Sequence, residues 1–66
     1  MKIVVIIPTY NERENIKKMI EVLEKEIFPK IKKHEMVILV VDDRSPDGTA
    51  DVVRKKMKKY ENIELF

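Results

Sequence analysis

Two short clusters of polar residues, each directly after an apolar run, carry the side chains best able to do chemistry. The first cluster is Pro8–Glu12, after the apolar run 3–7, and the second is Asp42–Gly48, after the run 36–41. Ligands of open α/β sheets bind in the crevice outside the carboxyl ends of the strands. If the two runs are parallel strands, both clusters therefore border one binding site.

The first cluster contains groups suited to a nucleoside. The ring of Tyr10 can stack on a nucleobase, and Asn11 and Glu12 supply an amide and a carboxylate for hydrogen bonds to base or ribose. A second interpretation stays open, in which Asn11 caps a following helix and Glu12 complements its dipole.

The second cluster opens with two adjacent carboxylates. Successive side chains of a strand point to opposite faces, so Asp42 and Asp43 are expected to differ in role, one accepting hydrogen bonds from a ligand and the other from neighbouring backbone. Together they also suit magnesium, although one strand end offers too few oxygens and ligand phosphates would have to complete the coordination. Residues Ser45–Thr49 equally suit a turn that caps a helix.

The elements that position these clusters follow from the apolar pattern. Strands are predicted at about 2–8, 36–42 and 62–66, and helices at about 13–28 and 49–60. Pro8 is expected to end the first strand, and Pro29 to stop or kink the first helix near Phe28. The residues expected to face the sheet are Ile16, Met19, Ile20, Leu23 and Ile27 from the first helix and Ala50, Val53, Met57 and Tyr60 from the second.

The predicted order β-α-β-α-β gives an α/β fold with a three-stranded parallel sheet in the order 3-2-1. Because such crossovers are almost always right-handed, both helices are expected on one face, which leaves the other face bare. Parallel sheets are normally covered on both faces, so a second copy of the chain or further polypeptide is expected to cover it. Residues 1–66 are thus expected to form a single, partial domain.

Size and composition exclude several classes of protein. The chain has 66 residues and no cysteine, so its small core is not reinforced by disulfides, and a reducing, cytoplasmic location is expected. A net charge of +2 does not favour nucleic acid, and no apolar run is long enough to span a membrane. A single glycine rules out dinucleotide and Walker phosphate loops, and the lone histidine, His34, lies outside both clusters. The abundance of Lys, Glu and Ile hints at a thermophile.

Taken together, the two clusters resemble a known family. The segments Val5–Glu12 and Val40–Thr49, about 30 residues apart, are similar to the start of an inverting GT-A glycosyltransferase of family 2, most of all to the dolichol-phosphate (polyprenyl-phosphate) mannose synthases. The resemblance covers roughly residues 3–55. It implies the first half of a Rossmann-like, nucleotide-binding GT-A domain, with a GDP- or UDP-sugar such as GDP-mannose as donor and a polyprenyl or dolichyl phosphate as acceptor.

The resemblance also implies roles for single residues. Those expected to contact the nucleotide are Pro8, Tyr10, Glu12, Val41 and Asp43, and those expected to support them are Thr9, Asn11, Asp42, Ser45, Asp47 and Gly48. Arg44 departs from the small or acidic residue usual at its position, and is expected to alter nucleotide preference or to pair with Asp47.

The family's metal-binding Asp-x-Asp motif and catalytic base find no match in these 66 residues. Mg²⁺ or Mn²⁺ is therefore expected for the complete family enzyme, and this chain alone is expected to bind its nucleotide without turnover. Two alternatives come from other classes. Ile38–Asp43 also resembles the first strand of a response-regulator receiver with an acidic magnesium site, and the bare sheet face suits a self-associating structural module.

Overall fold

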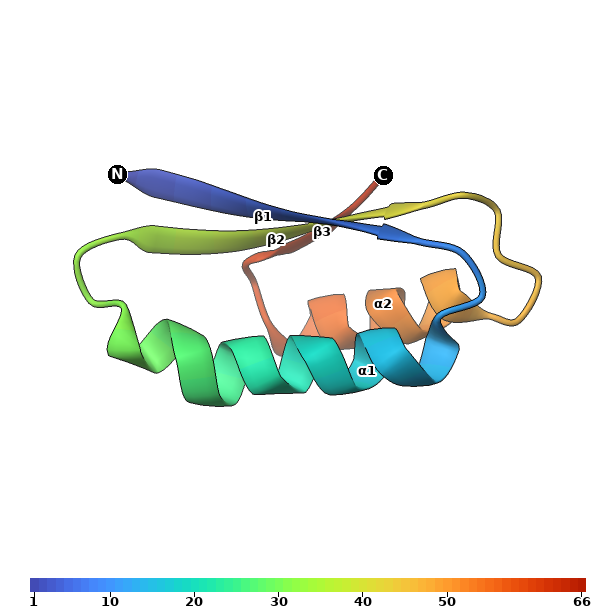
Figure 1. The fold of residues 1–66 in the computed structure, drawn as a ribbon, viewed down its shortest axis with the longest axis horizontal. Helices are drawn as coiled ribbons and strands as arrows, with labels where there is room; N and C mark the ends of the chain where they lie inside the picture. Colours follow the sequence, from blue (N-terminus) through green and yellow to red (C-terminus); the bar gives the residue numbers. More distant parts are fainter.

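The computed structural model describes residues 1–66 and consists of one sheet covered by one layer of helices (Figure 1). Three parallel strands alternate with two main helical segments. The elements are β1 (Lys2–Thr9), α1 (Arg13–Val22), the π-helical turn η1 (Leu23–Ile27), the 3₁₀ turn η2 (Phe28–Lys30), β2 (Glu35–Asp42), α2 (Thr49–Lys59) and β3 (Ile63–Leu65). Neither main helix has the length and hydrophobicity that crossing a bilayer requires.

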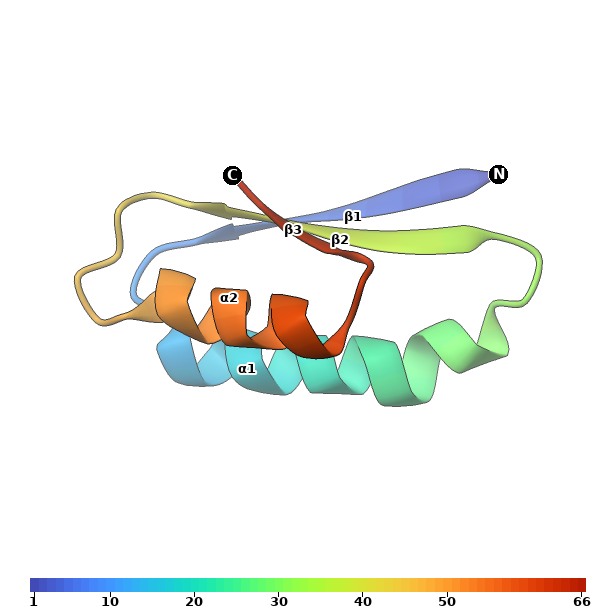
Figure 2. The same ribbon diagram turned by 180° about the vertical axis from the view of Figure 1, so that it is seen from behind.

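The sheet has the order β1-β2-β3, which is the predicted 3-2-1 order read from the opposite edge. Its parallel register pairs Thr9 of β1 with Asp42 of β2, so the two polar clusters begin side by side at the carboxyl edge. Both helices lie on the same face of the sheet, as the two opposite views show (Figures 1 and 2). The crossover rule thus gave the correct arrangement of layers.

The hydrophobic core lies between the sheet and the helices. Six residues are almost fully buried there, namely Ile16, Ile20, Ile38, Val40, Val53 and Ile63. On the other face of the sheet the apolar side chains of β1 meet solvent, with Val4 43% and Ile6 63% exposed. The bare face is therefore present, and its cover by a second copy or by further polypeptide stays a prediction.

Strand β1 runs through Pro8 to Thr9, so the expectation that Pro8 ends it is wrong. Proline cannot donate a hydrogen bond to a strand ladder, and it is tolerated mainly on edge strands. Because β1 is an edge strand, Pro8 can pair with Val41 without breaking the ladder. Thr9 is thereby placed inside the sheet, opposite Asp42.

The first helical path changes its winding at Phe28, where a stop or kink is predicted, but its α-helix is shorter than the predicted 13–28. The α-helix ends at Val22, and the backbone widens into the π turn Leu23–Ile27 before it tightens into the 3₁₀ turn Phe28–Lys30. Pro29 is accommodated because it lies at the start of that 3₁₀ turn, where an amide N–H is not needed. The change in winding keeps Phe28 packed against the core.

Three residues predicted to face the sheet are instead substantially exposed: Met19 (45%), Ile27 (42%) and Met57 (37%). Ile16, Ile20 and Val53 occupy the centre of the contact, and the outer members of each helix's apolar stripe extend beyond it.

A single carboxylate joins the two helices. Glu21 of α1 accepts hydrogen bonds from Lys56 and from the Tyr60 hydroxyl (3.0 Å), and it lies 3.4 Å from Lys59 and 3.0 Å from Lys25. These bonds, above all those from Lys56 and Lys25, hold the pKa of Glu21 well below its ordinary value. Glu21 thus remains charged and fixes α1 against α2.

Candidate functional site at the carboxyl edge of the sheet

Asp42 ties the ends of β1 and β2 together. Its Oδ1 accepts hydrogen bonds from the hydroxyls of Thr9 (2.8 Å) and Ser45 (2.5 Å), and its Oδ2 accepts one from the Ser45 amide (3.0 Å). The Ser45 hydroxyl contributes most to holding the pKa of Asp42 below its ordinary value, and the Ser45 amide and Thr9 add to the effect. The Asp43 amide donates in turn to the Thr9 carbonyl (3.0 Å).

The second cluster also caps the start of α1. The amide of Asn11 donates to Ser45 Oγ (2.8 Å), that of Glu12 to Thr49 Oγ1 (3.2 Å) and that of Arg13 to Asp47 Oδ2 (3.3 Å). The first amides of a helix have no partner within the helix, so these bonds meet a need that local sequence usually meets. Here the caps come from residues 34 to 37 positions away.

Asp47 has a second function at the start of α2. Its Oδ1 accepts hydrogen bonds from the Thr49 amide (3.1 Å) and from the Thr49 hydroxyl (2.5 Å). The Thr49 hydroxyl is the main cause that lowers the pKa of Asp47. Asp47 forms no ion pair with Arg44, so the pairing expected between them is not found.

Backbone conformation singles out three residues of this edge. Asn11 (φ +52°), Arg44 (φ +54°) and Gly48 (φ +87°) adopt the left-handed region. Glycine enters this region without cost and asparagine at low cost, whereas other side chains clash with the backbone. Arg44 is therefore the strained residue of the site, and its position is one where glycine or asparagine fits better.

Replacing Arg44 by glycine is expected to raise the unfolding free energy by about 1 kcal/mol, because the left-handed conformation no longer opposes a Cβ atom. Urea denaturation followed by circular dichroism measures the change. The matched control is Lys33→Gly, since Lys33 is an exposed residue without a positive φ and gains nothing from glycine. Equal or lower stability of Arg44→Gly than of the parent chain would contradict the strain.

The bonds within the clusters leave some predicted site residues free and engage others. Tyr10 is 57% exposed, and Pro8 and Asp43 are exposed as well. Val41 is half-buried, and so is Glu12, whose Oε2 accepts a hydrogen bond from Asn15 Nδ2 (2.8 Å). The supporting residues Thr9, Asp42, Ser45 and Asp47 are used in bonds inside the protein. Tyr10 and Asp43 are thus the side chains most available to a ligand.

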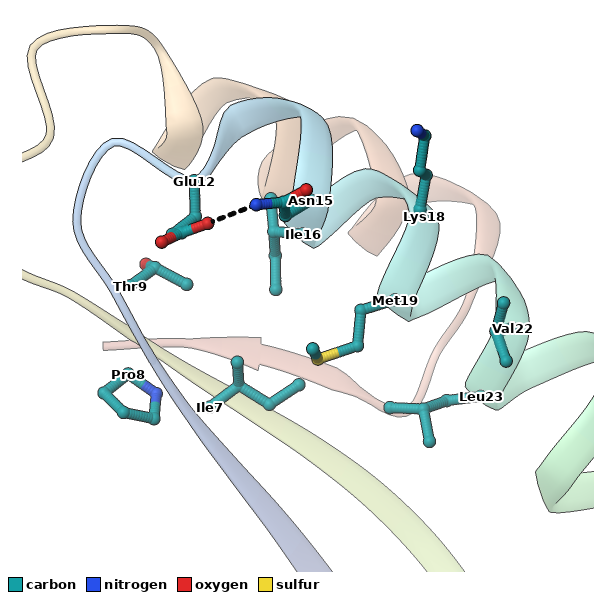
Figure 3. A pocket seen from close by; sticks show the side chains of 10 residues that line it. All are labelled: Ile7, Pro8, Thr9, Glu12, Asn15, Ile16, Lys18, Met19, Val22 and Leu23. Carbon is teal, nitrogen blue, oxygen red and sulfur yellow. Dashed lines mark hydrogen bonds between the residues drawn. The ribbon is translucent and has the colours of Figure 1, made fainter.

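A groove of about 610 Å³ adjoins this edge, between β1 and α1 (Figure 3). Its lining residues are Ile7, Pro8, Thr9, Glu12, Asn15, Ile16, Lys18, Met19, Val22 and Leu23. Asn15 and Lys18 were not predicted as part of a site. The three-residue spacing of Glu12 and Asn15, which places them on neighbouring turns of one helix face, is the sequence signal that points to their contact.

The residues of this edge do not make a metal site on their own. The protein has no group of three or more acidic, histidine or cysteine side chains placed to hold a metal ion. Both oxygens of Asp42 accept hydrogen bonds from Thr9 and Ser45, so Asp43 is the one carboxylate of the pair that is free to ligate. Divalent magnesium needs several oxygen ligands in near-octahedral geometry, which one carboxylate does not supply.

Comparison with known proteins gives a family for this geometry. Residues 4–66 match the sequence profile described as glycosyl transferase family 2. The match includes β1 and α1, the part of the chain that the receiver-like interpretation leaves unexplained. No solved structure gives a significant match.

Three curated relatives are similar over nearly all of the chain. Glycosyltransferase AglE of Haloferax volcanii is 44% identical over 62 residues, which are 94% of the chain and 19% of that protein. The poly(ribitol-phosphate) beta-glucosyltransferase of Bacillus spizizenii is 36% identical over the whole chain and 10% of its own length.

The third relative, from Methanococcus voltae, is 39% identical over 64 residues, or 94% of the chain and 19% of its own length. It is a dolichyl N-acetyl-alpha-D-glucosaminyl phosphate 3-beta-D-2,3-diacetamido-2,3-dideoxy-beta-D-glucuronosyltransferase. The chain therefore spans between a tenth and a fifth of the length of these relatives. With the profile match extending from β1 to the last residue, and with both strand-end clusters inside it, the chain belongs to glycosyl transferase family 2.

Proposed function

We propose that the carboxyl edge of β1 and β2 binds the nucleoside of a nucleotide-sugar donor in a sugar-transfer enzyme. The observation that carries the proposal is the way the two clusters are joined. The side chains of Asp42, Ser45 and Asp47 form hydrogen bonds within the protein that connect the two clusters at the carboxyl edge. Tyr10 and Asp43 remain exposed. They directly follow Thr9 and Asp42, which are paired in the sheet, so both lie at the same edge.

This arrangement gives each group a role. The exposed ring of Tyr10 stacks on the base, and the carboxylate of Asp43 accepts hydrogen bonds from N–H or O–H groups of the base or ribose. Pro8, Val41 and Glu12 form the surface around them. Asp42 does not contact the nucleoside itself. It supports the site, because its hydrogen bonds to Thr9 and Ser45 fix the backbone that carries Asp43.

The names of two relatives point to two kinds of acceptor, a lipid-linked sugar phosphate and a poly(ribitol-phosphate) polymer. The name of the Methanococcus voltae relative specifies a dolichyl-linked sugar phosphate, and that of the Bacillus spizizenii relative specifies poly(ribitol-phosphate). We propose that a complete enzyme containing this segment transfers its sugar to a polyprenyl or dolichyl phosphate. Mannose as the sugar, with GDP-mannose as donor, stays a prediction to be compared with UDP-sugars.

We further propose that these 66 residues bind without turnover. Transfer needs a base for the acceptor hydroxyl and a positive charge for the leaving diphosphate. Asp42 is held by internal hydrogen bonds, and Asp43 is assigned to the nucleoside. Mg²⁺ or Mn²⁺ would need ligands beyond the carboxylates of this edge.

Calorimetric titration with GDP, UDP, GDP-mannose and UDP-glucose tests the donor site. At least one is expected to bind, and Asp43→Asn is expected to weaken its affinity by about 10- to 100-fold, the loss of a hydrogen bond to a charged acceptor. Glu26→Gln is the control, because it removes the same charge from an exposed position on the turn η1. The proposal fails if none of the four nucleotides binds, or if the two variants lose affinity equally.

A further inference from the structure

A second hollow, of about 220 Å³, lies between α1 and α2 and is lined mostly by cationic side chains. The residues that form this basic groove are Arg13, Glu14, Lys17, Val52, Lys55, Lys56 and Lys59. Five of the seven are positively charged, one is acidic, and Val52 packs partly against the core. The chain as a whole carries only +2, so the groove concentrates positive charge that the rest of the surface balances.

Only part of this charge is neutralised within the protein. Glu21 pairs with Lys56 and Lys59, but the same carboxylate is shared with Lys25. Arg13, Lys17 and Lys55 take part in no ion pair. Glu21 holds the ammonium group of Lys56, whose side chain is 15% exposed, at the groove, while three further cations around it are unpaired.

Helix dipoles do not account for the groove. Lysines in the last turn of α2 complement the negative end of that helix, which suffices for Lys56 and Lys59. Arg13, however, is the first residue of α1, at the positive end of the helix, where a cation is unfavourable. Lys55 lies in the middle of α2 and gains little from either end. An anionic ligand bound in the groove would offset the repulsion among these side chains.

We propose that the basic groove binds the phosphate of an anionic phospholipid headgroup and so holds the helical layer against a membrane surface. Clusters of four to eight Lys and Arg residues on a helical surface are a recurrent device for binding anionic lipid. The groove lies between two helices that cover one face of the sheet and have no further layer outside them (Figure 2). The choice of lipid over other phosphates rests on the proposed lipid-linked acceptor, whereas the anion site itself does not.

Both helices begin at the carboxyl edge of the sheet, and the backbone amide of Arg13 donates a hydrogen bond to Asp47 Oδ2 of the strand-end site. The groove runs from Arg13 at this end to Lys56 and Lys59 in the last turn of α2, so a membrane bound along it lies beside the helical layer and reaches the end that carries the proposed donor site. This is the end where a lipid-linked acceptor has to meet the donor.

Cosedimentation with vesicles tests the groove. The chain is expected to bind vesicles of phosphatidylglycerol and phosphatidylcholine, and to bind pure phosphatidylcholine weakly. The double variant K17Q/K55Q is expected to lower the partition coefficient by about 25-fold, since each lysine near an anionic surface contributes about a fivefold factor. The matched control K32Q/K33Q removes the same charge from exposed residues outside the groove and is expected to lower it much less.

If the two double variants lose vesicle affinity equally, the proposed lipid site in the groove is wrong, because binding would then depend on net charge alone. Absence of binding to the anionic vesicles would overturn it as well. Two competitors separate the sources of phosphate. The first competitor is inorganic phosphate at millimolar concentration, and the second is a short single-stranded DNA. If either one releases the chain from the vesicles, the lipid assignment is wrong. Nucleotide calorimetry on the same samples reports separately on the donor site.

Discussion

Replacing Ile38 by alanine is expected to unfold most of the protein at 25 °C. Ile38 is fully buried in the middle of the central strand, where its removal leaves a cavity that costs about 2–5 kcal/mol. A chain of this size without disulfides rarely has a total stability above about 3–5 kcal/mol. The loss is therefore comparable with the whole unfolding free energy.

Ile6→Ala is the matched control for this prediction. It removes the same atoms from the neighbouring strand, but Ile6 is 63% exposed on the bare face, so its cost is expected to be about 0.5 kcal/mol or less. Urea unfolding followed by far-ultraviolet circular dichroism measures both variants. An equally large loss for Ile6→Ala would show that the bare face is covered in solution, and its dependence on protein concentration would identify a second copy as the cover.

Replacing Asp42 by asparagine is expected to lower the unfolding free energy by about 1–3 kcal/mol and to weaken nucleotide binding. Three donors from Thr9 and Ser45 converge on the carboxylate, and an amide offers them one neutral oxygen and an opposing NH₂ group. The loop that carries Asp43 is then no longer fixed. Asp51→Asn is the control, since Asp51 is exposed and pairs only with Arg54 at the surface.

The Asp42→Asn variant also tests how the contribution of Asp42 to the unfolding free energy changes with pH. The pKa of Asp42 is lower in the folded chain than in the unfolded one, so its contribution to stability is present above the ordinary carboxyl pKa. This contribution is lost as the pH falls through the lowered value. The difference in unfolding free energy between the parent chain and Asp42→Asn is therefore expected to shrink on acidification below about pH 4. A constant difference across that range would contradict the role of the charge.

The fold was largely predictable because its signals are local. Two apolar runs without polar alternation, 3–7 and 36–41, indicate buried parallel strands, and the crossover rule then fixes the position of the helices. The errors arise where a neighbour decides the outcome. Pro8 continues its strand because β1 lies at an edge, and Met19 and Ile27 are exposed because no neighbouring element covers them.

The site was predictable in its location but not in its internal bonds. That Asn11 and Ser45 meet follows from the parallel register of Thr9 and Asp42, which sequence spacing alone does not give. The alternative in which Asn11 caps α1 with its own side chain is not found, because that helix has no side-chain cap of its own. Ser45 and Asp47 of the other cluster, together with Thr49 at the start of α2, accept hydrogen bonds from the amides at its start.

These long-range caps couple ligand binding to folding. The hydrogen bonds that join residues 9–13 to residues 42–49 connect positions 33 to 37 apart, so the site disappears when the sheet separates. A nucleotide that binds there has no affinity for the unfolded chain, and at 100 times its dissociation constant it adds about 2.7 kcal/mol to the free energy of unfolding. For a chain of such low intrinsic stability, a nucleotide bound at the proposed site would supply a large share of the free energy that keeps the protein folded.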